Sequence, residues 1–332
     1  MKSTNISILF EIIYYRNLYE CRVNVSLIDK HIFHMIRDLK LDKTSGASEL
    51  IEIGLEIVKT QLDSIKDSQL DITDLIIKLS QELLKVRPSM APIINTIGYL
   101  LHDLEFYTKE NLLERYNGYP QEKERIEKAL SSSFHSFLDK YSGKKLKIML
   151  ISYSTTIIKC LKEIKTNDFS FYILEARPLL EGRRTAEILS SDFETHLIPD
   201  AAMGKFIDSV DLILLGIDSV LRDGSIVNKI GSYPLACIAA ANNKEVYAIG
   251  DSYKYNLTSH YGQEIIIESK PNYEVYSKKI KSKLFNVHNY YFDTTPSKYL
   301  SGIISDLGVL TIPEFLKEVK NAIPLEWFKS FL

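Results

Sequence analysis

The sequence has little cysteine, with Cys21, Cys160 and Cys237 as its three residues of this type. An odd, widely spaced set without a Cys-x-x-Cys pair gives neither a disulfide framework nor a zinc site, and it favours a reducing compartment. Apolar runs are also short. None reaches the ~20 residues of a membrane helix, and the run at 6–15 contains Glu11 and lacks a signal-peptide cleavage site. We therefore expect a cytoplasmic protein without a membrane partner.

Sequence signatures of cofactor and metal chemistry are absent as well. No Gly-x-Gly-x-x-Gly follows the first strand-like run, and there is no Walker loop, nucleophile elbow or His-Glu-x-x-His. His31 and His34 lie three residues apart without a third ligand, so neither a metal nor a cofactor is expected. The net charge of −2 provides no basic field, and direct binding to nucleic acid is not expected.

The first part of the chain has the pattern of helices. Residues 1–142 carry apolar residues at helical spacing and predict a helical domain, with its last helices over about 92–107 and 121–140. The second of these segments is rich in Glu and Lys, as an exposed helix face would be. A polar stretch at 141–145 then marks the expected boundary between two domains.

The second part, residues 143–332, alternates strand-like and helix-like segments. Short apolar runs occur at 146–151, 171–174, 195–198, 212–215 and 246–249, with helical patterns between them. Continuous apolar strands separated by helices are typical of a parallel sheet that is covered on both faces. We therefore predict an α/β protein in which a helical bundle precedes a Rossmann-like domain with a mainly parallel sheet.

Polar residues follow the ends of the predicted strands and form a candidate site. Ser152, Ser154 and Thr155 close the first strand and open a helix, where hydroxyl and backbone N–H groups either bind phosphate or simply cap the helix. Arg177 follows the second strand, where its guanidinium could clamp a phosphate or pair with a neighbouring glutamate. These residues leave both interpretations open.

The later strands add charged groups to the same predicted edge. Asp218 follows a buried strand, where a carboxylate is costly unless it is paired or used, for instance to bind hydroxyls or as a general base. Asn228 and Lys229 stand at an expected helix start, and Lys254 follows the next strand. Because the carboxyl ends of parallel strands meet at one edge of a sheet, these residues predict a pocket for a small anionic molecule.

Several motifs are recognisable together. The longer ones are EARPLLEGRRTA at 175–186, PDAAM at 199–203, GIDS at 216–219 and NKIGSY at 228–233. Shorter ones are DKTSGAS at 42–48, RPSMAP at 87–92 and FDTTP at 292–296. Over roughly residues 35–310 the chain thus resembles the translation initiation factor 2B alpha, beta and delta regulatory-subunit family, which also includes methylthioribose-1-phosphate isomerase and ribose-1,5-bisphosphate isomerase.

This resemblance implies a helical domain on a Rossmann-like domain, a homodimer formed through the C-terminal domains, and a pocket between the domains for a sugar phosphate or a nucleotide. It places Asp200 in the expected ligand site. It also places Ser45, Gly46 and Ala47 there, at the position of an isomerase Arg-Gly-Ala motif whose arginine helps to hold phosphate. The protein partners that it implies are initiation factor 2 and sister subunits.

The resemblance also separates catalytic from non-catalytic readings. The isomerases have Thr-His-Cys at the end of the first strand, and Ser154 stands here at the position of the catalytic cysteine, with Asp218 at that of the aspartate. An unactivated serine hydroxyl is far less acidic than a thiol. We therefore favour a non-catalytic regulatory protein. The alternatives are an aldose–ketose isomerase acting on a phosphorylated pentose (ribose-1,5-bisphosphate or methylthioribose-1-phosphate type) and a purely structural subunit with an empty pocket.

Overall fold

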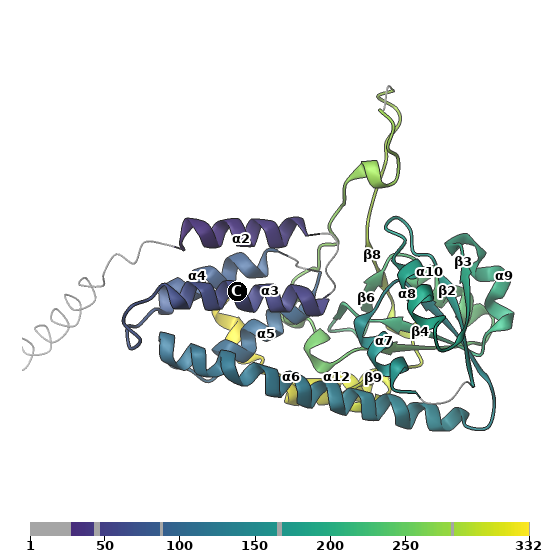
Figure 1. Cartoon of the computed structure of the whole chain (residues 1–332), viewed down its shortest axis with the longest axis horizontal. Coiled ribbons are helices and arrows are strands. Elements are labelled where there is room, and N and C mark those ends of the chain that lie inside the picture. The colour runs from purple at the N-terminus through teal and green to yellow at the C-terminus, as the bar shows by residue number, and fades with distance from the viewer. Residues whose placement is uncertain (1–27, 43–46, 87–88, 165–167, 280–281, 332) are drawn as a thin grey trace, which may run out of the picture.

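The computed structural model describes residues 28–42, 47–86, 89–164, 168–279 and 282–331. A group of helices is followed by an α/β part, and the long helix α6 runs beneath both (Figure 1). The helices of the first group are α2 (Lys30–Leu41), α3 (Ala47–Asp63), α4 (Thr73–Leu84), α5 (Ala91–Leu101) and α6 (Lys109–Leu138). Within the described residues, no helix is both long enough and apolar enough to cross a membrane.

The predicted helices over 92–107 and 121–140 are wrong in their bounds. α5 ends at Leu101, and α6 begins at Lys109 and continues through Pro120 without interruption. A reciprocal cap explains the early start of α6: Thr108 Oγ1 accepts the N–H of Asn111 at 3.3 Å, and Asn111 Oδ1 accepts the N–H of Thr108 at 3.0 Å.

Helix α6 connects the two parts of the molecule through its buried side chains. Leu112 and Ile126, in its first half, belong to the core of the helical group. Phe134 and Phe137, in its second half, are almost fully buried against one face of the sheet. Because large aromatic side chains contribute a large apolar area to a core, this packing fixes the helical group relative to the sheet.

The main sheet has seven strands in the order β10-β9-β7-β4-β1-β2-β3, and all neighbours are parallel except β9 and β10. This confirms the predicted α/β class with a mainly parallel sheet. The strands are β1 (Leu146–Ile151), β2 (Phe169–Leu174), β3 (Glu194–Ile198), β4 (Leu212–Gly216), β7 (Glu245–Ile249), β9 (Gly302–Ser305) and β10 (Gly308–Leu310). The connecting helices are α7 (Thr155–Lys162), α8 (Glu181–Leu189), α9 (Met203–Phe206), α10 (Ser232–Ala241), α11 (Leu257–His260) and α12 (Ile312–Ala322).

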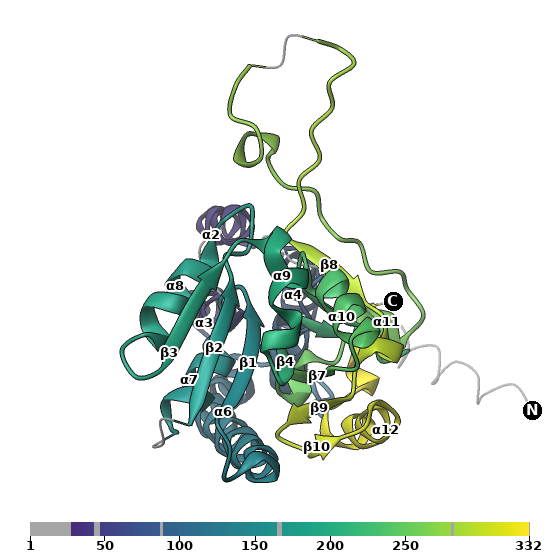
Figure 2. The ribbon, with the colours of Figure 1, turned by 90° about the vertical axis from the view of Figure 1, so that its right-hand side faces the viewer.

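Alternate residues of the central strands enter different cores. Ile148 and Leu150 of β1 pack with α6 and α7, whereas Met149 and Ile151 belong to the core that includes residues of α10 and α12. Figure 2 shows helices in front of and behind the strands. A sheet covered on both faces favours apolar residues on both sides of a strand, as in β4, whose five residues are all buried.

A second, antiparallel sheet was not predicted. It contains β5 (Ser219–Val220), β6 (Ile226–Lys229) and β8 (Phe292–Thr295). Asn228 and Lys229 therefore lie at the end of a strand, and the expectation that they open a helix is wrong. Helix α10 starts three residues after Lys229, beyond Gly231, whose φ of +103° suits a glycine.

Asp293 of β8 provides the cap of α10. Its carboxylate accepts the N–H of Gly231 at 2.7 Å and the N–H of Tyr233 at 3.3 Å. Burial raises the pKa of Asp293 to about 6, although these two hydrogen bonds favour the charged form. Because the pKa of Asp293 in the folded state lies above its unfolded value, the protonated carboxyl contributes to the stability of the fold. This contribution is complete below about pH 4 and is lost as the pH rises through 6.

Asp293→Asn should therefore flatten the pH dependence of stability. We expect the decrease in the free energy of unfolding between pH 4 and pH 7 to become smaller by roughly 2 to 3 kcal/mol, as measured by urea denaturation. Asp208→Asn, at an exposed residue after α9, is the matched control. A decrease as large in Asp293→Asn as in the control would contradict this assignment.

Candidate functional site

A cavity of about 510 Å³ lies where β1, β4 and β6 end, and we call it the first cavity. Its floor comes from the β1–α7 connection, from Gly216 to Asp218 and from the end of β6. Its opposite wall includes Leu50 and Met90 from the helical group. The cavity thus lies at the sheet edge where ligands of open α/β sheets bind.

Most of the candidate residues line the first cavity: Ser152, Ser154, Thr155, Asp218, Asn228, Lys229 and Lys254. Ser45 and Gly46 lie outside the described residues, and Ala47 is the first residue of α3. Four further positions in the cavity lining have charges that the predicted site did not include: Asp42, Glu181, Arg184 and Lys270.

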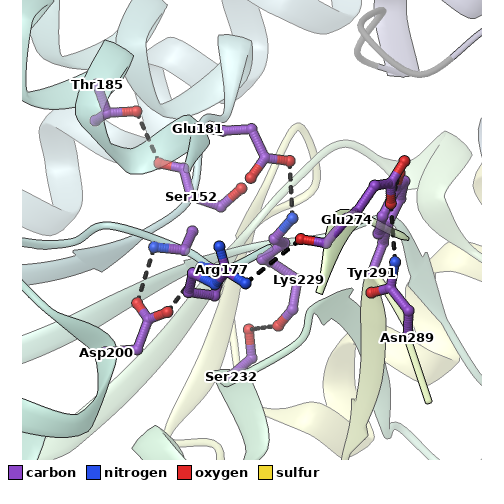
Figure 3. A network of polar contacts seen from close by, with 11 residues as sticks. Ser152, Arg177, Glu181, Thr185, Asp200, Lys229, Ser232, Glu274, Asn289 and Tyr291 are labelled. Atoms are coloured by element: carbon purple, nitrogen blue, oxygen red, sulfur yellow. Dashed lines mark hydrogen bonds and ion pairs between the residues drawn. The ribbon is translucent and has the colours of Figure 1, made fainter. Parts of the chain in front are cut away.

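Arg177 and Asp200 do not line this cavity, and the structure gives both a different place. The carboxylate of Asp200 accepts the N–H of Ala176 at 2.8 Å and the N–H of Arg177 at 2.7 Å. The guanidinium of Arg177 donates to the carbonyl oxygen of Glu274 at 3.4 Å (Figure 3). Ala176, with φ of +63°, is held in a strained conformation by this arrangement. Both residues therefore shape the loop after β2 rather than contact the first cavity.

The connection between β1 and α7 brings hydroxyl groups to the cavity. Ser154 is the N-cap of α7, and its Oγ accepts the N–H of Ile157 at 3.3 Å. Ser152 has φ of +68°, and its carbonyl oxygen accepts the hydroxyl of Thr185 in α8 at 2.7 Å. This bond holds the strained turn in place, so that Ser154 and Thr155 can face the cavity.

Gly216, at the end of β4, allows side chains from two elements to approach each other. A Cβ at this position would lie 3.3 Å from Asn228 Oδ1 and 3.4 Å from Ser154 Oγ. The amide of Asn228 in turn donates to Ser232 Oγ at 2.9 Å. A larger residue at 216 would therefore press on both side chains, which line the cavity.

Lys229 is buried, with 4% of its surface exposed, and its ammonium is paired. Its Nζ lies 2.8 Å from Glu181 Oε1 and 5.2 Å from the centre of the Tyr291 ring. Figure 3 shows Glu181 reaching down from α8 to this ammonium. The second oxygen of Glu181 is buried without a hydrogen-bond partner among the described residues. Glu181 thus already balances much of the charge of Lys229.

Lys254 is also buried, with 7% of its surface exposed, but its ammonium makes no hydrogen bond or ion pair within the described part of the chain. It lies near Asp218, which faces the cavity and is partly accessible from it. Burial raises the pKa of the Asp218 carboxyl, whereas the charges of Lys254 and then Lys229 oppose this rise. The residue as a whole is buried, and an anion bound in the cavity would compensate the charge of its ammonium.

Two cationic groups that sequence reasoning missed complete the lining. The guanidinium of Arg184 stacks over the ring of Tyr153 at 4.2 Å, and Lys270 Nζ lies 5.2 Å from the centre of the Tyr291 ring. Arg184 lies inside the EARPLLEGRRTA motif at 175–186, which could have suggested it. Lys270 belongs to the long segment that leaves the body after α11 and returns at β8 (Figures 1 and 2), which has no motif of its own.

The cavity lining contains Arg184, Lys229, Lys254 and Lys270 against Asp42, Glu181 and Asp218. Hydroxyls, an amide and an excess of positive groups around this cavity suit a small anion with polar substituents. No cysteine is among the residues that line it. Cys160 instead lies on the buried face of α7, where burial raises the pKa of its thiol to about 12.

Comparisons with known proteins agree with this picture. The family model described as the Initiation factor 2 subunit family matches residues 43–312. An eIF-2B subunit 2-like protein of Pyrococcus horikoshii is 28% identical over 291 residues, 86% of this chain and 99% of that protein. Ribose 1,5-bisphosphate isomerase of Methanocaldococcus jannaschii is 26% identical over 275 residues, 80% of this chain and 84% of that enzyme.

A solved structure shows the same architecture. The crystal structure of translation initiation factor eIF-2B from P. horikoshii superposes with a TM-score of 0.72 at 27% sequence identity. The match covers 87% of this chain and 99% of that structure.

Proposed function

The chain belongs to the Initiation factor 2 subunit family, and from that premise we propose that it is a non-catalytic regulatory protein whose first cavity binds a sugar phosphate or a nucleotide. Its relatives include eIF-2B-like proteins and sugar-phosphate isomerases. Since one fold serves both groups, the chemistry of the cavity has to distinguish between them.

The observation that carries the proposal is the unpaired ammonium of Lys254. It is buried beside Asp218 in a cavity that also contains Lys229, Arg184 and Lys270. A phosphate oxygen at Lys254 would provide the partner that the described residues do not, and charge-assisted hydrogen bonds of this kind are strong. The hydroxyls of the β1–α7 connection would hold the rest of a sugar phosphate.

The local chemistry of Ser154 supports a non-catalytic role. Its hydroxyl caps α7 and makes no hydrogen bond to a histidine or lysine among the described residues. A serine without an adjacent base is a poor proton donor or nucleophile at neutral pH. The thiol of Cys160 does not substitute, since its side chain is buried beside α6.

A working aldose–ketose isomerase is the second candidate, and Asp218 favours it. A carboxyl whose pKa is raised by burial can take up and release a proton nearer to neutral pH than an ordinary aspartate. Asp218 would then act as the base on a phosphorylated pentose. An isomerase would also need a second group to carry out the opposite proton transfer, and the residue at that position is Ser154.

We also propose the cellular setting that the family implies: a cytoplasmic homodimer formed through the α/β part, with initiation factor 2 or sister subunits as partners. The two parts of the chain, 1–142 and 143–332, would act as a helical domain and a ligand-binding and dimerisation domain. A size measurement in solution, by light scattering on the purified protein, tests the dimer directly.

The proposal is tested by calorimetry and thermal shift with ribose 5-phosphate, ribose 1,5-bisphosphate, methylthioribose-1-phosphate, AMP and GMP. Every ligand that binds is then analysed for its keto isomer after incubation. We expect at least one phosphorylated compound to bind and to be recovered unchanged. Conversion to the ketose would establish the isomerase instead, and the absence of binding by all five would favour the purely structural role.

A further inference from the structure

A second cavity of about 380 Å³ adjoins the first between α6 and α7. Thr155 and Thr156, at the start of α7, line both cavities. The neighbouring residues Leu50 and Ile51 of α3 line one each. The two cavities therefore adjoin at the first turn of α7.

The second cavity has two polar groups that can bond to a ligand. Tyr253 lines it, and its hydroxyl makes no hydrogen bond within the described ranges. Asp251 Oδ1 is buried and has no hydrogen-bond partner among the same residues. A buried acceptor of this kind is rare in folded proteins because it loses its bonds to water on burial. The two groups together favour a ligand with a polar edge that bonds to both.

The other walls are apolar or carry charges that are mostly paired. Ile51, Ile126 and Leu130 provide an apolar surface. Three lysines at the rim are paired: Lys159 Nζ lies 2.7 Å from Glu127, Lys123 Nζ 2.8 Å from Glu52 and Lys128 Nζ 2.6 Å from Glu124. Glu163 accepts the hydroxyl of Ser131. The cavity thus offers flat apolar contact and a short polar edge, which suits a planar heterocycle better than a second sugar or phosphate.

Lys254 joins the two cavities electrostatically. Its ammonium lines the first cavity, and its charge acts on the carboxyls of both Asp218 and Asp251, opposing the effect of burial on each pKa. Its backbone N–H also donates to the carbonyl oxygen of Asp251 at 3.0 Å. A phosphate bound at Lys254 would therefore stand next to the entrance of the second cavity.

We propose that the second cavity holds the base of a nucleoside monophosphate whose phosphate and ribose occupy the first cavity. The Tyr253 hydroxyl and the Asp251 carboxyl bond to the polar edge of the base, and the apolar side chains of α3 and α6 contact its faces. This inference depends on the proposed function and narrows its ligand from sugar phosphates and nucleotides to nucleotides.

Calorimetry with AMP, GMP and ribose 5-phosphate tests the inference, since these compounds share a phosphorylated ribose and differ in the base. We expect the better of the two nucleotides to bind at least tenfold more tightly than ribose 5-phosphate. Tyr253→Phe removes only a hydroxyl that has no hydrogen-bond partner in the part of the chain that the structure describes, and it should leave folding intact. The substitution should lower the ratio of the nucleotide affinity to the ribose 5-phosphate affinity about fivefold, which is the effect of losing one hydrogen bond.

Tyr107→Phe is the matched control, because the Tyr107 hydroxyl bonds to the carbonyl oxygen of Leu101, and the residue lines neither cavity. It should leave the ratio unchanged. Equal binding of nucleotides and ribose 5-phosphate would overturn the inference and leave the proposed function standing. A ratio unaffected by Tyr253→Phe would also overturn it. Absence of binding by all three compounds would overturn the inference too, and the proposed function would then stand or fall with ribose 1,5-bisphosphate and methylthioribose-1-phosphate.

Discussion

Gly182→Ala is expected to destabilise the protein by about 3 kcal/mol or more, the largest effect on folding that we predict for a single methyl group. Gly182 lies in the first turn of α8, and a Cβ there would overlap the carbonyl oxygen of Leu174. Leu174 is the last residue of β2 and is fully buried, so its backbone cannot move aside without disturbing the sheet. Urea denaturation measures the loss.

Gly54→Ala provides the matched control for this substitution. Gly54 lies inside α3, and a Cβ there would have no atom within 4 Å. Since alanine favours the helix over glycine by about 1 kcal/mol, this variant should be as stable as the wild type or more so. Comparable stability of the two variants would show that α8 can shift away from β2.

The position of α8 also matters for the site, because α8 carries Glu181 and Arg184 to the first cavity. If part of the Gly182→Ala protein still folds, it should therefore lose the Lys229–Glu181 ion pair. The close approach of α8 to β2 thus connects a packing constraint in the core to the arrangement of charges in the pocket.

Five strands of the main sheet, β1, β2, β3, β4 and β7, could be predicted because they read as short apolar runs, whereas β9 and β10 were not predicted. The small sheet could not, since β5 has two residues and β6 ends in the polar pair Asn228 and Lys229. A strand that ends in an amide and an ammonium resembles a helix start in sequence. The difference comes from pairing with β8, more than 60 residues away, which local patterns do not encode.

The candidate site shows the same division between what local sequence does and does not determine. Ser154, Asp218 and Lys254 follow strands, and the structure places all three on one cavity. Arg177 also follows a strand, yet it bonds elsewhere, because the turn after β2 passes through positive φ angles at Ala176 and Leu180. Strand order therefore predicts the edge at which a residue lies, but backbone angles decide where its side chain points.

The strongest test of the site is Lys254→Met, which should weaken the binding of any phosphorylated ligand by about 2 to 4 kcal/mol, or roughly 30- to 1000-fold. Methionine keeps much of the length of the side chain and removes the charge. Without Lys254, Asp218 loses the charge that most strongly opposes the burial-induced rise of its pKa. The cavity then presents a less favourable field to an anion. Calorimetry with the tightest ligand of the wild type measures the change.

Lys317→Met, at an exposed lysine of α12, controls for a general change in net charge and should leave the affinity within about twofold. Lys229→Met gives an internal comparison in the same cavity. Because Lys229 already balances Glu181 at 2.8 Å, an incoming anion gains less from it than from an unpaired ammonium. The loss of affinity should therefore be greater for Lys254→Met than for Lys229→Met. The opposite order would mean that the Lys229–Glu181 pair opens when the ligand binds and that Lys229, rather than Lys254, receives the phosphate.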